Sequence, residues 1–201
     1  MSTLSPIENP QVLKSIQKEA IHIASYLSSC SPLYSSANSK ISHHCQLMSR
    51  HVERLKYRHE ILFTGLARKF DLECQQIATT TTHTNLTISN VFCQKLLHMY
   101  NYLFADKQIT WGRIITLYSF AQFLIQRIQK QDAEQAQRIG LLTGQYVASR
   151  LAKWIMNNGG WESLENFTDD ADKMNDTYHT LFAFAITCLG ISLFVLFLVV
   201  R

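Results

Sequence analysis

The sequence is poor in the residues that dominate extended, cross-linked or disordered proteins. Its 201 residues include only three prolines and seven glycines, and 17% of them are charged. The five cysteines are odd in number and form no CxxC pair, which fits neither a disulfide framework nor a zinc site. With 47% hydrophobic residues, the chain can form one domain with a core of its own.

The charges are few and scattered, and the familiar chemical motifs are missing. The formal net charge is +4, and no basic run carries interleaved aromatic residues, so we expect no nucleic-acid partner. The chain has no GxGxxG, P-loop or HExxH motif, and no carboxylate stands at a recognisable spacing from a nucleophile. We therefore expect neither an enzyme nor a bound cofactor.

Four histidines, His43, His44, His51 and His59, fall within one predicted helix. Their spacings only loosely approach the i, i+4 pair that a helical metal site requires. We expect them to lie on a solvated helix face and to hold no metal.

Apolar residues recur at helical spacing along most of the chain, and no stretch shows the alternation typical of strands. The predicted fold class is therefore all-α. The spacing predicts helices over residues 11–27, 42–70, 89–103, 114–125 and 132–156, followed by a short turn at 161–167.

The boundaries between these helices follow from punctuating residues. Residues 28–41 form a predicted serine-rich linker that contains Pro32, and residues 71–87 a loop or short helical turn. Gly65 predicts a bend in the second helix, and Ser89 can cap the third. The helix that starts near Asp132 should stop at the Asn157–Gly160 run, because glycine readily adopts the left-handed conformation of a helix C-terminus.

One segment is apolar nearly all round. Between residues 114 and 125 only Thr116, Ser119 and Gln122 interrupt the apolar residues. The segment is too short to span a bilayer comfortably, so it predicts the central helix of a helical bundle.

The C-terminal segment predicts a membrane anchor. Leu181–Val200 contains no charge and no proline, and a helix of that length rises roughly 30 Å, one hydrocarbon core. We expect residues 1–179 to form a cytosolic helical domain and residues 180–201 a single transmembrane helix. The acidic residues upstream of the anchor leave both the mitochondrial outer membrane and the endoplasmic reticulum open as locations.

Two short motifs resemble those of a known family. The first runs from Leu103-Phe104-Ala105-Asp106 to Trp111-Gly112-Arg113-Ile114, and the second is Trp154-Ile155 followed by Gly159-Gly160-Trp161. Together they resemble the first and second homology motifs of the Bcl-2 family of apoptosis regulators. Within that family, His59-Glu60 and the segment 63–72, with the ungapped spacing from Asp106 to Trp111, look most similar to the pro-survival myeloid cell leukaemia branch.

The resemblance implies a bundle around a central apolar helix, with a surface groove that accepts an amphipathic killer helix of a pro-apoptotic relative. In such a groove Arg113 would hold the carboxylate of the partner's Asp, and Gly112 would allow a close backbone approach. An arginine at the start of an apolar helix has no evident packing role. The groove residues that the resemblance implies are Leu66, Met99, Tyr100, Leu103, Asp106, Thr110, Gly112, Arg113, Thr116, Leu117 and Phe120.

Other motif residues are expected to be structural. Leu103, Leu117 and Phe120 are equally consistent with plain core positions. The residues expected to lock helix ends are Trp111, Trp154, Gly159, Gly160 and Trp161.

The chain departs from the family pattern at two positions. Thr110 stands where the family usually has Asn, which keeps a helix cap but removes an amide donor. Lys107 stands where the family has Gly, which removes a flexible turn residue.

The family contains protectors and executioners with one fold, so the fold does not decide between them. An executioner needs a working third motif, and here its apolar positions are His44, Met48, His51 and Leu55, with Val52 and Glu53 at the small-Asp pair. Two histidines, a bulky valine and an overlong acid make a poor killer helix, which favours a pro-survival protein. A pore-forming effector that forms homo-oligomers and a tail-anchored adaptor with a vestigial groove stay open.

Overall fold

The computed structural model describes residues 9–28, 39–80 and 88–167, and these are almost entirely helical. This confirms the predicted all-α fold class. The elements in chain order are α1 (Pro10–Ser28), α2 (Ser39–Arg58), α3 (Glu60–Thr80), α4 (Ile88–Leu103), α5 (Trp111–Ile128), α6 (Ala133–Tyr146), a π-helical turn (Val147–Leu151), α7 (Ala152–Asn157) and a 3-10 helix (Trp161–Asn166).

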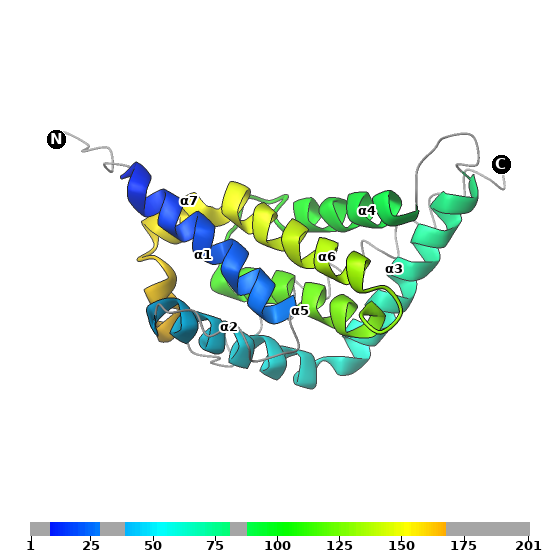
Figure 1. Ribbon diagram of the computed structural model, residues 1–201, viewed down its shortest axis with the longest axis horizontal. Coiled ribbons are helices and arrows are strands. Elements are labelled where there is room, and N and C mark those ends of the chain that lie inside the picture. The colour runs from blue at the N-terminus through cyan, green and yellow to red at the C-terminus, as the bar shows by residue number, and fades with distance from the viewer. Residues whose placement is uncertain (1–8, 29–38, 81–87, 168–201) are drawn as a thin grey trace.

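Helix α5 is the central helix, as its composition predicts. Fourteen of its 18 residues are buried, and it contacts α1, α2, α3 and α6. Figure 1 shows α5 in the middle of the bundle, with α2 below it and α4 and α6 above it. A helix surrounded on most sides has no face left for charged residues, which explains its nearly continuous apolar sequence.

Side chains cap the first turns of α5 and α6. Thr110 accepts a hydrogen bond from the backbone N–H of Arg113 at 3.3 Å and begins α5. Asp132 accepts from the N–H of Gln135 at 2.8 Å and begins α6. Both are short polar residues that satisfy otherwise unpaired donors of the first turn.

Helices α1 and α6 form the most extensive contact of the bundle. Gly144 faces α1 so closely that an added Cβ would lie 2.9 Å from the Cα of Ile21 and 3.0 Å from the Cβ of Ala24. Figure 1 shows α1, in blue, running beside α6. Small residues on both helices therefore let the two backbones approach each other.

The long helix predicted over residues 42–70 is two helices, and the predicted bend at Gly65 is wrong. The break lies at His59, between α2 and α3, while Gly65 continues the α3 helix. The break lets each helix bury its apolar face against different neighbours: α2 packs on α1 and α5, and α3 packs on α4. A glycine is not needed for this change of direction.

Three further boundaries differ from the sequence-based predictions. Residues 71–80 extend α3 instead of forming a loop, and α4 begins at Ile88, so Ser89 lies within the helix and does not precede it. Of the predicted 28–41 linker, Ser28 ends α1 and residues 39–41 begin α2.

Within the described ranges, no helix is long and apolar enough to cross a membrane. The predicted anchor at Leu181–Val200 lies outside the described residues, so it stays a prediction.

Candidate functional site

Arg113 lies in the first turn of α5 and binds a carboxylate through both arms of its guanidinium group. Nη1 donates to Oδ1 of Asp106 at 2.5 Å, and Nη2 donates to Oδ2 at 2.7 Å. Nη1 also donates to the carbonyl oxygens of Leu103, at 3.2 Å, and Gln108, at 2.9 Å. The guanidinium therefore joins the last turn of α4 to the start of α5.

This geometry corrects the view that Arg113 has no packing role. Only 9% of the residue is exposed, and its hydrogen bonds hold the α4–α5 corner closed. The Asp106 side chain is 49% exposed, so its side of the ion pair faces solvent. The hydrogen bond from Arg113 also holds the pKa of Asp106 below its usual range.

The same corner contains a strained residue. Lys107 has a φ of 61°, and no other non-glycine residue of the described part of the chain has a positive φ. A side chain with a Cβ is disfavoured in this left-handed conformation. Because lysine stands where the family has glycine, the left-handed conformation of residue 107 strains its backbone.

The predicted groove floor comes together but is covered. Its apolar members come from α3, α4 and α5 and belong to one core cluster. They are 0–6% exposed: Leu66, Met99, Tyr100, Leu103, Leu117 and Phe120. In this state the set is part of the core and forms no exposed surface.

Two predicted groove residues, Tyr100 and Thr116, form hydrogen bonds inside the bundle. The hydroxyl group of Tyr100 lies 2.9 Å from Oγ1 of Thr143 on α6, so the phenol points toward α6. Thr116 is fully buried and donates to the carbonyl oxygen of Gly112 at 2.8 Å. Their assignment to a groove is not tested by this arrangement and stays a prediction.

The three tryptophans link the two motifs. The ring of Trp111 lies 5.7 Å from that of Trp154 and 5.6 Å from that of Trp161, between ring centroids. The indole N–H of Trp161 donates to the carbonyl oxygen of Ile16 at 3.3 Å, which adds α1 to the cluster. Gly159 and Gly160 have φ values of 92° and 70°, which explains glycine at the end of α7.

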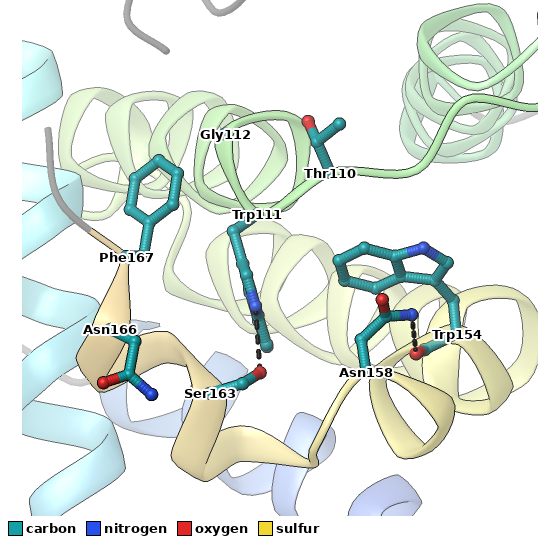
Figure 2. A pocket seen from close by; sticks show the side chains of 8 residues that line it. All are labelled: Thr110, Trp111, Gly112, Trp154, Asn158, Ser163, Asn166 and Phe167. Atoms are coloured by element: carbon teal, nitrogen blue, oxygen red, sulfur yellow. Dashed lines mark hydrogen bonds between the residues drawn. The ribbon is translucent and has the colours of Figure 1, made fainter. Parts of the chain in front are cut away.

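A cleft of about 460 Å³ opens beside this cluster. Figure 2 shows Trp111 and Trp154 on its walls, with the indole N–H of Trp111 donating to Oγ of Ser163 at 3.1 Å. Sequence reasoning missed part of the lining, although these residues flank the recognisable Gly159-Gly160-Trp161 motif. The complete lining is Thr110, Trp111, Gly112, Trp154, Asn158, Ser163, Asn166 and Phe167.

The predicted solvated face of histidines is wrong for His44. His44 is buried, and its Nδ1 forms a hydrogen bond with Oε1 of Glu19 on α1. That bond raises the pKa of His44 and outweighs the opposing effect of burial. No cluster of metal-binding side chains occurs in the described part of the chain.

Helix α2, which carries the chain's own third-motif positions, turns its apolar face into the bundle. Met48 and Val52 are fully buried, and Leu55 nearly so. Near its end, Lys56 donates to the side-chain oxygens of Gln122 at 2.9 Å and Gln126 at 2.7 Å on α5. In this state α2 is part of the core and presents no apolar face to a partner.

A model of the family described as "Apoptosis regulator proteins, Bcl-2 family" matches residues 48–161. The chain belongs to the Bcl-2 family. The match includes α3, α4, α5 and α6 and both tryptophan motifs. The family consists of regulator proteins, in line with the expectation that the chain is not an enzyme.

Individual relatives match shorter parts of the chain than the family model does. Human Bcl-2-like protein 1 is 27% identical over 106 residues, which is 50% of this chain and 45% of that protein. Mouse apoptosis regulator BAX is 33% identical over 66 residues, 32% of this chain and 34% of that protein. The chain thus spans about half or less of the length of the curated relatives it matches.

Solved structures support the Bcl-2-like fold. The zebrafish pro-survival protein NRZ in its complex with Bad BH3 superposes with a TM-score of 0.59 at 18% identity, over 79% of this chain and 98% of that one. Chicken BOK superposes with the same TM-score and identity, over 78% and 98%. At this identity the likeness concerns the fold alone.

Proposed function

We propose that this Bcl-2 family member is a pro-survival regulator that binds amphipathic killer helices of pro-apoptotic relatives in a groove between α3, α4 and α5. The observation that carries the proposal is the Arg113 fork. The guanidinium already binds the Asp106 carboxylate through Nη1 and Nη2, and the carboxylate side of this ion pair faces solvent. A partner's Asp is the same ligand, so Arg113 is preorganised for it.

In the unliganded protein Asp106 is the internal competitor for Arg113. An incoming carboxylate must displace Asp106 or share the guanidinium with it. The bonds from Nη1 to the carbonyl oxygens of Leu103 and Gln108 keep the group oriented during the exchange. A charged hydrogen bond of this kind contributes roughly 1.5–3 kcal/mol.

Opening of the groove requires movement of α3. Its polar attachments include ion pairs from Glu73 to Lys95 on α4 and from Asp71 to Arg127 on α5, the latter at 2.6 Å. The Asp71–Arg127 pair is partly exposed and can be exchanged for hydration at a small cost, whereas the buried Glu73–Lys95 pair needs a new partner when α3 moves. The apolar face of a partner helix would then cover the exposed floor.

The condition of α2 supports a protector over an executioner. Its third-motif face is buried, and polar bonds hold it through His44 to α1 and through Lys56 to α5. Glu53 stands at the position of the motif's Asp, and its carboxylate is occupied by Lys56 at 3.1 Å. A pore-forming effector is the second candidate, favoured by the matched segment of mouse BAX and by the apolar α5 helix.

Further parts of the proposal rest on sequence alone. They are a place nearest the myeloid cell leukaemia branch, a single-pass anchor at Leu181–Val200 in the mitochondrial outer or endoplasmic reticulum membrane, and heterodimers with pro-apoptotic relatives. Self-association would instead support the effector.

The deciding experiment measures release of a dye from liposomes. The full-length protein is added with and without a killer-helix peptide, and then together with a known effector. We expect suppression of the effector's release and no release by the protein alone. Peptide-triggered release by the protein itself would establish the effector instead.

Variants test the role of Arg113. Peptide affinity for the liposome-bound protein should fall about ten- to a hundredfold in Arg113→Ala and rise in Asp106→Asn, which removes the internal competitor. Arg138→Ala is the matched control, because Arg138 forms an exposed pair with Glu134 on α6. A double-mutant cycle with the peptide's Asp separates direct contact from altered folding; no coupling would remove the role assigned to Arg113.

A further inference from the structure

Lys69 on α3 has a buried charge with no partner. Its Nζ atom is inaccessible to solvent and forms no hydrogen bond with any described residue. Buried ammonium groups are normally paired, because removal of the charge from water is unfavourable unless a partner compensates for it. An unsatisfied group of this kind in a native structure therefore asks for a functional explanation.

The spacing of Lys69 from Glu73 places it on the side of α3 that faces α4. Glu73 follows it by one helical turn, on the same side, and forms an ion pair with Lys95 of α4. The charge of Glu73 is thus already neutralised by Lys95. Among these described side chains, the positive charge of Lys69 is left without a hydrogen-bond partner.

Lys69 also lies beside the predicted groove floor. Leu66, one turn earlier on α3, belongs to that floor. The next residue, Phe70, contacts Phe92 of α4 at 4.6 Å and Phe120 of α5 at 6.0 Å, between ring centroids. Its neighbours thus place Lys69 at the edge of the surface that would be uncovered if α3 and α4 separated.

We infer that Lys69 is a second anion site of the groove, which takes an acidic side chain of the partner helix. The inference rests on the proposed function and adds a specificity-determining residue to it. The groove would then hold two cations, Arg113 and Lys69, at separate points of one apolar surface. A partner with one acid for each cation is favoured over a partner with a single acid.

The spacing between the two acids follows from α5. Phe120, which meets the neighbour of Lys69, follows Arg113 by seven residues. At about 1.5 Å per residue this is roughly 10 Å along the axis, or two turns of a partner helix. The second acid should therefore lie on the same face as the Asp bound by Arg113, about two turns away.

The experiment uses the full-length protein on liposomes and a series of fluorescent amphipathic peptides. Each peptide keeps the Asp for Arg113 and carries one Glu, placed in turn at positions one to three turns before or after it, with a Gln version as its pair. Affinities are measured for the wild type, Lys69→Gln and Arg68→Gln. Arg68 is the matched control, because it is the exposed cationic neighbour of Lys69 on the same helix.

We expect one Glu position, near two turns, to bind the wild type about tenfold more tightly than its Gln pair. The gain should persist in Arg68→Gln and disappear in Lys69→Gln. A series without any such position, or a gain that survives Lys69→Gln, overturns the inference while leaving the proposed function intact. Failure of every peptide to bind the wild type overturns both.

Stability without peptide supplies a second readout. Lys69→Met keeps the apolar stem and removes the unpartnered charge, so the unliganded protein should unfold at a higher denaturant concentration than the wild type. A lower midpoint would show that the ammonium group is satisfied in the unliganded state, and would overturn the inference.

Discussion

The α1–α6 interface and the attachment of α3 are built by different means. Between α1 and α6, small residues bring the backbones together, and an added methyl group at Gly144 would meet the backbone of α1 at 2.9 Å. Helix α3 has Gly65 on its surface with nothing within 4 Å of an added Cβ. Its polar attachments include the Glu73–Lys95 and Asp71–Arg127 ion pairs.

The difference predicts that the α1–α6 side stays rigid and that the α3 side moves first. Close-packed backbones lose roughly a quarter to a half of their dispersion energy when they separate by about 0.5–1 Å, so such an interface resists partial opening. On the α3 side, the partly exposed Asp71–Arg127 pair exchanges with water at a small cost. Movement of α3 must also uncover Phe70 and separate the buried Glu73–Lys95 pair, so we expect it to need a replacement partner for both. The unpartnered Lys69 belongs to the α3 side.

The largest effect is expected when glycine is replaced by alanine at the α1–α6 interface and, for comparison, on the surface of α3. Gly144→Ala should lower the free energy of unfolding by about 1–3 kcal/mol, because the new methyl group overlaps α1. Gly65→Ala should raise it by roughly 0.5–1 kcal/mol, because the site is open and alanine favours helix. Urea unfolding followed by circular dichroism measures both, and equal signs for the two variants would contradict the contrast.

A smaller effect is expected at the α4–α5 corner. Lys107→Gly should stabilise the protein by about 1 kcal/mol, because glycine adopts a φ of 61° without steric strain. Lys130→Gly is the control, since Lys130 lies in the α5–α6 turn without a positive φ. Thermal unfolding compares the two variants, and a destabilised Lys107→Gly would show that the conformation is not strained.

The smallest effect concerns pH and α2. The bond to Glu19 raises the pKa of His44, so its contribution to stability is complete below the unfolded pKa of about 6.5 and declines as pH rises through the folded value. The loss should stay below about 1 kcal/mol, because neutral His44 can still donate a hydrogen bond. Amide hydrogen exchange of α2 should quicken relative to α6 as pH rises from about 6 to 8.

His44→Gln serves as the comparison for this pH dependence. The variant should show a flatter profile in the same range. Burial lowers the pKa of His59, which acts in the opposite direction at lower pH and remains in both proteins. An unchanged profile in the variant would assign the pH dependence to another group.

Several features could be predicted from local sequence because their physical causes are local. The period of apolar residues located most helices, and the continuous apolar run identified α5 as the central one. Thr110 was expected to cap α5 and does so. The glycines after α7 were expected at a helix end and have positive φ values there.

Other features depend on residues that are distant in the sequence. His44 was expected on a solvated face with the other histidines, yet Glu19 of α1, 25 residues away, makes it a buried partner. The break at His59 follows from which neighbours α2 and α3 meet, and not from any helix-breaking residue. The spacing of His44 from Met48 could have indicated its burial, but neither its partner nor the break at His59 follows from a local pattern.

The sequence by itself determined the helical period, the order of the helices, the central position of α5 and the placement of an arginine at its start. Only the tertiary structure decided what that arginine binds, which side of the bundle is close-packed, and that the charge of Lys69 is left without a partner. The physical reason is that helix formation depends on neighbours within a few residues. The pairing of buried charges depends on which distant helices fold against each other.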